Sequence, residues 1–258
     1  MITSRDNDLI KLVSKLMTSA KARRENCLFA AEGVRLCRDA LLSGAAVDTF
    51  IYTPRAAEKY PDDFRALCSS AERSVEVSNE LFAKIADTGA PQGFMCIIRH
   101  DRSSHEFLPE PGRKYIALEN IQDPSNLGTI LRTAEALGTD GVILSADCCD
   151  IVSPKVVRGS MGAVFRLPYM TVPAFPESIH EWIRMGLACY ASTPRDAQDI
   201  RTVDFSQGGI ILIGNEGGGL RPETIEACSR RVRIEMRGRA ESLNAAAAAA
   251  ILMYEMFR

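Results

Sequence analysis

The sequence predicts an α/β protein with a small N-terminal domain and a second domain built on a parallel sheet. Three observations predict this class. Short apolar runs alternate with helical patterns along the 258 residues. The runs of the C-terminal half, such as GVIL at 141–144, are almost continuously apolar, as expected of parallel strands covered on both faces. A polar stretch at 99–113 separates the two halves.

The N-terminal part, residues 1–98, has the pattern of a small α/β domain. Apolar residues recur there with helical spacing in some segments and form short runs in others. The expected elements are helices over 8–17 and 34–42 and strands over 27–31, 49–52 and 94–98. The stretch 99–113 that follows contains two prolines and a glycine, which is the composition of a linker.

The second domain is expected over 114–258. Its expected strands cover 115–119, 141–144, 187–191 and 208–214, and a helical pattern covers 126–137. A last helix is expected to begin near Ser242, because the alanine run that follows has the highest intrinsic helix propensity.

Composition argues against several classes of protein. Apolar residues make up 46% of the chain and charged residues 25%, as in soluble globular proteins. The N-terminus lacks an apolar signal segment and no run is long enough to cross a bilayer, so we expect a cytoplasmic protein without membrane contact. The eight cysteines have no CxxC spacing and the three histidines do not pair with them, so no metal site is expected. Most of these cysteines lie in apolar runs, which is consistent with a reducing compartment.

Basic residues are clustered although the formal net charge is −2. One cluster lies between residues 15 and 38 and another between 230 and 239, and both are candidate contacts for phosphate groups. For the first cluster an ordinary solvated surface is an equally good explanation.

Three segments of the second domain could carry chemistry, and the first is ENIQDPSNLGTILRTAEALG at 119–138. It runs from the end of an expected strand into a helix. Asn126 and Arg132 lie nearly two turns apart, so Arg132 can project along the helix from an amide near its start. The two side chains could hold an anionic ligand. Taken alone, this segment is better explained as a capped helix with one surface arginine.

The second segment is ILIGNEGGGLRPETIEAC at 211–228, a strand followed by a glycine-rich turn and a helix that starts at Pro222. Its glycines allow bare backbone groups to approach a ligand, and Glu216 could accept hydrogen bonds from hydroxyl or amine groups. The segment lacks the second glycine of GxGxxG and has no GK[ST], so it is neither a dinucleotide fingerprint nor a P-loop. A tight turn explains it equally well.

The third segment is RVRIEMRGRAESLNAAAAAA at 231–250. Ser242 is a natural N-cap for the last helix, whereas Asn244 is a poor helix former at a position where alanine would be easier. Asn244 is therefore a candidate functional residue. The alanines favour close approach of another backbone, as in an intersubunit helix, although an ordinary buried helix is the simpler explanation.

In this order and spacing, NxGxxxR, GNEGGGL and SLN resemble the three motifs of the SpoU/TrmH family of RNA 2′-O-methyltransferases, in the SPOUT superfamily. The close match covers about 114–258, and residues 1–98 resemble the substrate-binding domain of ribosomal-RNA members, with KARRENCLFAAEGVRL as the recognisable part. Two features depart from the family. Glu235 stands where proline usually follows the isoleucine of the third motif, and the residues after SLN are all alanine in place of a Val-Ser-like pair.

The resemblance implies methyl transfer from S-adenosylmethionine to a ribose 2′-hydroxyl of structured RNA, with ribosomal RNA favoured over transfer RNA. It also implies an L30e-like N-terminal domain, a C-terminal trefoil knot and a homodimer. By similarity, the cofactor contacts would be Gly214, Ile234, Met236 and Leu243. The reaction centre would contain Asn126, Arg132, Glu216, Ser242 and Asn244. The expected RNA contacts of the N-terminal domain are Arg23, Arg24 and Arg35.

Arg132 is a poor candidate for the general base. Proposals for the family make the matching arginine the general base, yet a guanidinium is effectively never deprotonated in proteins. We therefore expect Arg132 to bind the phosphate next to the target ribose and to stabilise developing charge, and to act as the base only if its environment perturbs it strongly. Asn126 and Ser242 are expected to orient the nucleophile.

Alternative functions are a transfer-RNA 2′-O-methyltransferase and a non-catalytic RNA-binding paralogue. A nucleotide-dependent oxidoreductase is disfavoured by the missing fingerprint. Binding of S-adenosylmethionine would separate a methyltransferase from both the RNA-binding module and the oxidoreductase.

Overall fold

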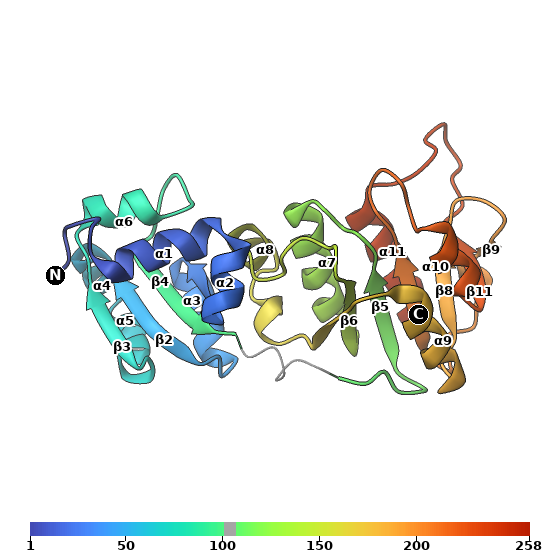
Figure 1. Cartoon of the computed structure of the whole chain (residues 1–258), viewed down its shortest axis with the longest axis horizontal. Coiled ribbons are helices and arrows are strands. Elements are labelled where there is room, and N and C mark those ends of the chain that lie inside the picture. Colours follow the sequence, from blue (N-terminus) through green and yellow to red (C-terminus); the bar gives the residue numbers. More distant parts are fainter. Residues whose placement is uncertain (101–106) are drawn as a thin grey trace. The chain divides into compact units, whose positions relative to one another are not determined.

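The structure of this chain is a computed structural model that describes residues 1–100 and 107–258. Residues 101–106 of the expected linker 99–113 lie outside the described part. The chain divides into two compact units (Figure 1). The first unit comprises Met1–Arg102 together with Asp150–Arg166, and the second comprises Ser103–Cys149 and Leu167–Arg258. The predicted α/β class is confirmed.

The first unit contains a four-stranded sheet in the order β1-β4-β2-β3. The strand β4 pairs antiparallel with β1 and β2, and β2 pairs parallel with β3. The strands are β1 (Leu28–Glu32), β2 (Val47–Tyr52), β3 (Arg73–Glu76) and β4 (Phe94–Arg99). The helices of this unit are α1 (Asp8–Thr18), α2 (Ala20–Asn26), α3 (Val34–Leu42), α4 (Pro54–Lys59), α5 (Pro61–Ser70), α6 (Asn79–Ile85) and α8 (Pro154–Gly159).

The core of the first unit forms where the apolar faces of α1 and α6 meet the sheet. Leu16 of α1 and Phe82 of α6 pack with Ile97 of β4 in one buried cluster. The helix α1 begins where the sequence predicts it, because the side chain of Asn7 accepts a hydrogen bond from the backbone of Leu9 at 3.0 Å and caps the first turn.

The segment 150–166, which follows the second strand of the other unit in sequence, belongs to the first unit. Its helix α8 packs on β1, and Phe165 stacks on Phe29 with 6.2 Å between ring centroids. Asp150 forms an ion pair with Arg23, with 2.7 Å between Oδ2 and Nε. This excursion of the chain was not visible in the hydrophobic pattern.

The second unit contains a seven-stranded sheet in the order β7-β6-β5-β10-β8-β11-β9, and every neighbouring pair is parallel. Its central strands carry buried apolar residues on both faces, as predicted from their continuous apolar runs. The strands are β5 (Lys114–Leu118), β6 (Gly141–Ser145), β7 (Tyr169–Val172), β8 (Cys189–Ser192), β9 (Gln198–Asp199), β10 (Gly209–Ile213) and β11 (Arg230–Arg233).

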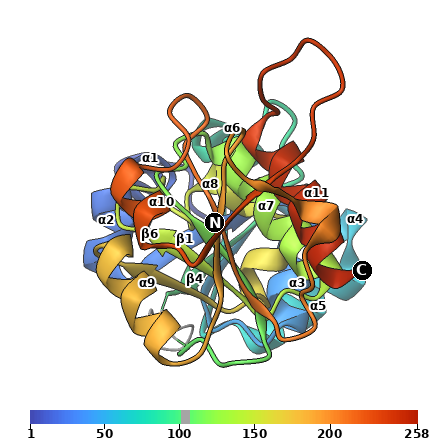
Figure 2. The same ribbon diagram turned by 90° about the vertical axis from the view of Figure 1, so that its right-hand side faces the viewer.

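Two pairs of helices cover this sheet. The helices α7 (Pro124–Leu137) and α11 (Ala245–Phe257) lie side by side, and Figure 2 shows them together. The helices α9 (Phe175–Arg184) and α10 (Pro222–Ala227) contact each other and bury Trp182 and Ala227 in one cluster with Ile210 of the sheet. The described residues include no helix that is long and apolar enough to cross a membrane.

The start of the last helix differs from the prediction. The helix α11 begins at Ala245, and its N-cap is Asn244 instead of Ser242. The Oδ1 atom of Asn244 accepts hydrogen bonds from the backbone amides of Ala246 at 2.9 Å and Ala247 at 3.2 Å. Asparagine is unfavourable inside a helix but is among the preferred residues at the N-cap, which explains why it directly precedes the alanine run.

Candidate active site

The first two predicted segments meet because the strands before them are neighbours. The strand β5 leads into the first segment and β10 into the second, and Leu118 pairs with Ile213 at their carboxyl ends. The chain passes from β5 to β6 on one side and later returns through β8 and β10 on the other. This reversal makes the carboxyl ends of β5 and β10 a topological switch point, where open α/β sheets bind ligands.

A line of hydrogen bonds joins all three segments. The Nδ2 atom of Asn244 donates to Oδ1 of Asn126 at 2.9 Å, and Nδ2 of Asn126 donates to Oε1 of Glu216 at 3.0 Å. Asn126 is 7% exposed, so both ends of its amide are largely withdrawn from water and are satisfied by protein. Three of the predicted reaction-centre residues, 90 and 118 positions apart in sequence, therefore act as one unit.

Glu216 is held as a carboxylate by this arrangement. Its oxygens also accept from the backbone amides of Asp123 at 3.2 Å and Gln122 at 3.4 Å. Burial raises the pKa of Glu216, but the hydrogen bonds from Asn126 and from backbone amides outweigh burial and lower the pKa below its usual range. Glu216 therefore serves as an acceptor that fixes the loop after β5, and the low pKa makes it a weak base.

The glycine-rich turn has a fixed shape. The backbones of Asn215 and Gly219 exchange two hydrogen bonds, and the Oδ1 atom of Asn215 accepts from Gly217 at 2.9 Å and Gly218 at 3.1 Å. A side chain at Gly214 would place its Cβ 2.0 Å from the backbone carbon of Gly219, so only glycine fits there. The turn thus closes on itself and leaves backbone groups of 214–219 facing a cavity.

The cavity beside this turn has a volume of about 300 Å³. Its walls come from the glycine turn, from the stretch after β11 and from the start of α11. Apolar side chains line much of it, among them Ile213, Val232 and Leu252. All four predicted cofactor residues lie in its wall: Gly214, Ile234, Met236 and Leu243.

Ser242 and Arg132 have different surroundings from the three linked residues. Ser242 lies in the cavity wall, and its side chain has no hydrogen bond within the described residues. Arg132 is exposed on α7, about 9 Å along the helix from Asn126 and about 120° around it. Nothing in the described part of the chain pairs with its guanidinium, so Arg132 is available to a ligand from outside.

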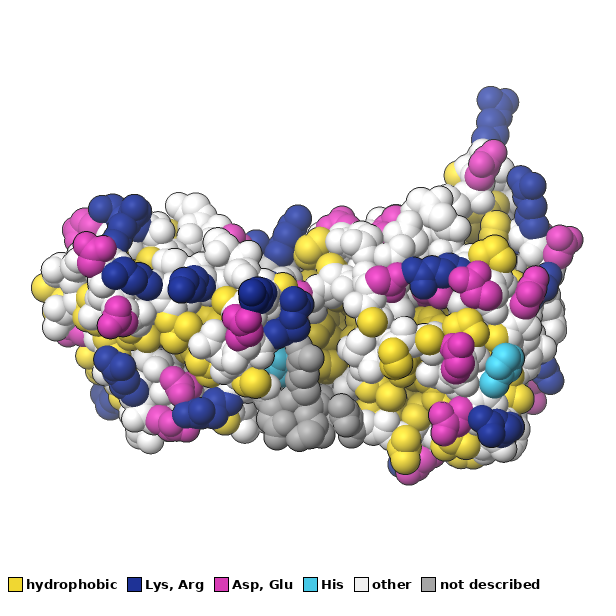
Figure 3. Space-filling view, in the orientation of Figure 1, with side chains coloured by type: hydrophobic (Ala, Val, Ile, Leu, Met, Phe, Trp, Pro, Cys, Tyr) yellow, Lys and Arg dark blue, Asp and Glu magenta, His cyan; other side chains and the backbone are white. Residues whose placement is uncertain are grey.

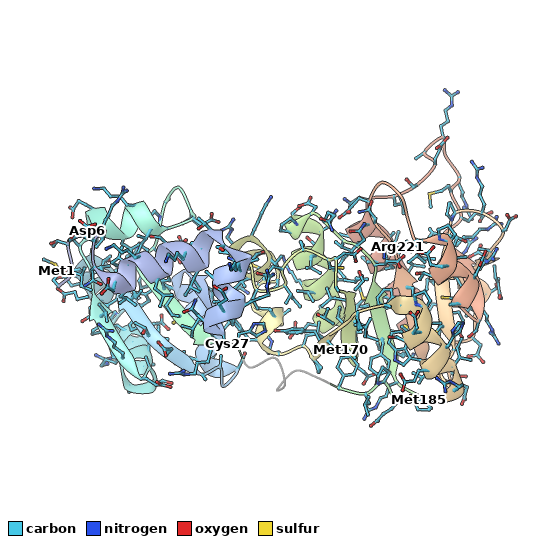
Figure 4. The ribbon with its side chains drawn as sticks, viewed as in Figure 1. Met1, Asp6, Cys27, Met170, Met185 and Arg221 are labelled. Atoms are coloured by element: carbon cyan, nitrogen blue, oxygen red, sulfur yellow. The ribbon has the colours of Figure 1, made fainter. Side chains whose placement is uncertain are left out.

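Two acidic residues near the site were missed by the sequence reasoning. Glu119 is 1% exposed, and its oxygens accept from Thr224 Oγ1 at 2.6 Å and from the backbone of Arg221 at 2.7 Å. It therefore ties the end of β5 to the start of α10. Asp147 forms an ion pair with Arg221, which is labelled in Figure 4. A carboxylate directly after the apolar run YIAL was the signal that could have identified Glu119.

The predicted RNA contacts of the first unit divide into two kinds. Arg23 is 5% exposed, and besides Asp150 it donates to the backbone oxygen of Leu16 at 2.5 Å. The Arg23 guanidinium is thus buried and already paired in this structure, and it would have to leave these partners to contact an RNA phosphate. Arg24 and Arg35 are exposed and form no ion pair within the described residues.

Glu235, which departs from the family pattern, forms an ion pair with Arg201. Arg201 in turn binds Asp199 of β9 and lowers the pKa of that carboxyl to about 2. The segment between Ile234 and Met236 is thus attached to the edge of the sheet. Beyond it, the loop 234–244 extends away from the unit, and basic side chains project from it in Figure 3; Arg237 in this loop has 80% of its side chain exposed.

Comparison with known proteins gives concordant matches for both units. Residues 113–254 match the SpoU rRNA Methylase family, and residues 7–96 match the MRM3-like substrate binding domain. An uncharacterized tRNA/rRNA methyltransferase of Synechocystis is 35% identical over 257 residues, which are 100% of this chain and 93% of that protein.

Two further proteins match over nearly the whole length. The 23S rRNA (guanosine(2553)-2′-O)-methyltransferase RlmP of Bacillus subtilis is 28% identical, over 99% of this chain and 98% of that protein. The crystal structure of an AdoMet-bound rRNA methyltransferase from Sinorhizobium meliloti has a TM-score of 0.87 at 32% identity, over 99% of this chain and 96% of that one.

Proposed function

Because this chain belongs to the SpoU rRNA methylase family, we propose that it transfers a methyl group from S-adenosylmethionine to a ribose 2′-hydroxyl of ribosomal RNA. The observation that carries this proposal is the line of hydrogen bonds from Asn244 through Asn126 to Glu216. It joins all three family motifs beside a cavity of about 300 Å³.

The residues around the cavity fit S-adenosylmethionine. Ile234, Met236 and Leu243 offer apolar contact for an adenine ring, and the turn at Gly214 offers backbone donors and acceptors where no side chain fits. When bound there, the cofactor supplies a methyl group already activated by its sulfonium.

The residues of the chain then have mainly to place the ribose, because positioning can supply most of the acceleration of such a transfer. Asn126 and Asn244 form a rigid edge of the site, held by Glu216. We assign to Ser242, whose hydroxyl is uncommitted, contact with the 2′-hydroxyl, and to Arg132 the adjoining phosphate. Arg132 acts as a fixed positive charge and not as the base.

The experiment that tests this function uses the purified chain with methyl-labelled S-adenosylmethionine and either 23S ribosomal RNA or transfer RNA. We expect label in ribosomal RNA only, at a linkage that resists alkali, since methylation of the 2′-oxygen blocks cleavage there. Label in alkali-sensitive positions would refute the assigned reaction, and label in transfer RNA alone would favour the other substrate class.

A substitution separates the proposed roles within the site. Arg132→Ala should reduce methyl transfer at least about 1,000-fold, since loss of one well-placed charge stabiliser costs on the order of 10²–10³ in rate and phosphate binding is lost as well. Binding of S-adenosylmethionine, measured by calorimetry, should stay within about two-fold of the wild type because Arg132 lies outside the cavity wall. Equal loss of cofactor binding and transfer would contradict this assignment.

Other properties are proposals that rest on family membership. We propose domains at 1–98 and 114–258, an L30e-like N-terminal domain that binds RNA through Arg24 and Arg35, and a cytoplasmic location. We also propose a trefoil knot at the C-terminus and a homodimer. Light scattering of the purified chain tests the homodimer directly, and a monomeric mass would contradict it.

A further inference from the structure

A second cavity lies in the first unit, far along the sequence from the three motifs. Its volume is about 380 Å³, which is within the range of about 300–1,000 Å³ that is common for small-molecule sites. The walls are formed by the helix α4 with the residues directly before and after it, by Asn79 and Phe82 of α6 and by the segment 90–93. Nothing in the proposed methyl transfer uses this cavity.

The floor of this cavity is constrained by a close backbone approach. Gly93 has φ +87°, and a Cβ there would lie 2.5 Å from Thr53 Oγ1 and 2.8 Å from Ala56 Cβ. The backbone of Thr53 donates to the oxygen of Gly93 at 3.0 Å, and the Thr53 hydroxyl accepts from the amide of Ala56 at 3.2 Å. Because this floor is hydrogen-bonded and has no room for a larger residue, the cavity is pre-formed.

Its rim is positively charged. Arg55 and Lys59 lie on successive turns of α4, and both are exposed. None of the described residues that line the cavity is acidic, and neither cation has an ion-pair partner within the described part of the chain. Two unpaired cations at one opening are suited to an anionic ligand such as a phosphate.

One wall of the cavity is aromatic. Tyr60 is half-buried, its ring meets Phe94 edge-on with 6.0 Å between centroids, and the ammonium of Lys59 lies 5.2 Å from the centre of the Tyr60 ring. The contact with Phe94 holds the ring in place. A fixed ring beside a cation is a stacking platform of the kind that single-stranded RNA bases use.

Amide groups complete the wall. The Oε1 atom of Gln92 accepts from the backbone of Val34 at 2.9 Å, so its amide nitrogen is the end left to donate. Asn79 at the start of α6 is exposed and also lines the cavity. These side chains can form hydrogen bonds with the edge of a planar ligand that lies against Tyr60.

We propose that this cavity binds one unstacked nucleotide of the substrate RNA, with its base on Tyr60 and its phosphate at Arg55 and Lys59. The identification of the ligand as RNA rests on the proposed function. The size of the cavity, its cations and its aromatic wall suit a single nucleotide better than a protein segment, which would require a longer apolar groove. The cavity therefore adds a point of RNA recognition within the first unit.

The test compares two charge-matched double variants in binding of a 23S ribosomal RNA transcript by fluorescence anisotropy. Arg55→Gln with Lys59→Gln removes both cations at the rim. Arg73→Gln with Lys84→Gln removes two exposed cations of the same unit that do not line the cavity. We expect about 10-fold weaker binding for the rim variant and less than three-fold for the control. Equal weakening of both would reduce the effect to general charge and overturn the proposal.

The stacking role has its own variants. Tyr60→Phe keeps the ring and should bind RNA as the wild type does, whereas Tyr60→Leu removes the ring and should weaken binding roughly 5- to 100-fold. Circular dichroism shows whether Tyr60→Leu is folded. Binding by Tyr60→Leu that stays within two-fold of the wild type would refute the proposal, as would cross-links from a 4-thiouridine transcript that avoid peptides 53–60 and 79–93 altogether.

The outcome is separable from that of the proposed function. If the wild type binds RNA in a way that depends on the rim and on Tyr60, but incorporates no methyl group, the proposed function fails and the cavity assignment stands. If methyl transfer and RNA binding are both unaffected by these variants, only the cavity assignment fails. A rim variant that binds RNA normally but no longer binds a ribosomal protein that the wild type binds would show that the cavity binds a protein instead.

Discussion

Replacing Asn244 tests whether the three motifs are coupled as the structure indicates. In Asn244→Ala, two contributions are lost. The cap of α11 contributes about 1 kcal/mol, and the hydrogen bond to Asn126 contributes about 1 kcal/mol, because the acceptor it leaves is buried. The free energy of unfolding of the second unit should therefore fall by about 2 kcal/mol.

The single tryptophan of the chain makes this measurement specific. Trp182 is buried in α9 of the second unit, so its fluorescence during urea unfolding reports that unit. Asn244→Ser is the matched control, because serine caps a helix as well as asparagine does but is too short to take over the amide's contact with Asn126. We expect Asn244→Ser to lose about 1 kcal/mol and Asn244→Ala about 2 kcal/mol.

A double-mutant cycle decides whether the reasoning holds. Asn126→Ala and Asn244→Ala should be non-additive by about 0.5–1.5 kcal/mol, since each removes the same hydrogen bond. Additivity within about 0.3 kcal/mol would show that the two amides do not interact, and would refute the coupling of the first and third motifs.

Three further predictions follow from single contacts. Hydrogen bonds hold the pKa of Glu216 below its unfolded value of about 4.3, so the ionised carboxylate stabilises the fold above that pH, and this stabilisation is lost as the pH falls through the folded pKa. In a pH series of urea unfolding, Glu216→Gln should flatten the dependence of the free energy of unfolding on pH in this range. An unchanged dependence would contradict the prediction. Arg23→Ala should destabilise the first unit by about 3–5 kcal/mol in circular-dichroism melts, because it breaks the buried ion pair with Asp150. The control Arg24→Ala should change stability by less than about 0.5 kcal/mol, and similar losses in both variants would be evidence against the buried pair. Arg201→Gln should raise the KM for S-adenosylmethionine about three-fold with little change in kcat, since it releases Glu235 beside the cavity. A loss confined to kcat would show that the Arg201–Glu235 pair does not act through cofactor binding.

Much of the fold could be predicted from the sequence because its signals are local. Alternating apolar runs and helical patterns place α1, α3 and the central strands within one or two residues of their observed bounds. NxGxxxR, GNEGGGL and SLN identified the family through their order and spacing, which can be read directly from the sequence although each motif alone has an ordinary explanation. Gly214, Ile234, Met236 and Leu243, which that resemblance predicts as cofactor contacts, line one cavity.

The tertiary structure decided what these local patterns could not. Asn126, Glu216 and Asn244 become hydrogen-bonded partners because β5 and β10 are neighbours in the sheet and α11 packs beside α7, and strand order is not written in any single segment. The same holds for Arg23, which looks like a surface cation in its own helix but is buried by Asp150 from a segment 127 residues away. Sequence determined which groups are present and which elements carry them, whereas packing between distant segments determined which of those groups remain free to meet a ligand.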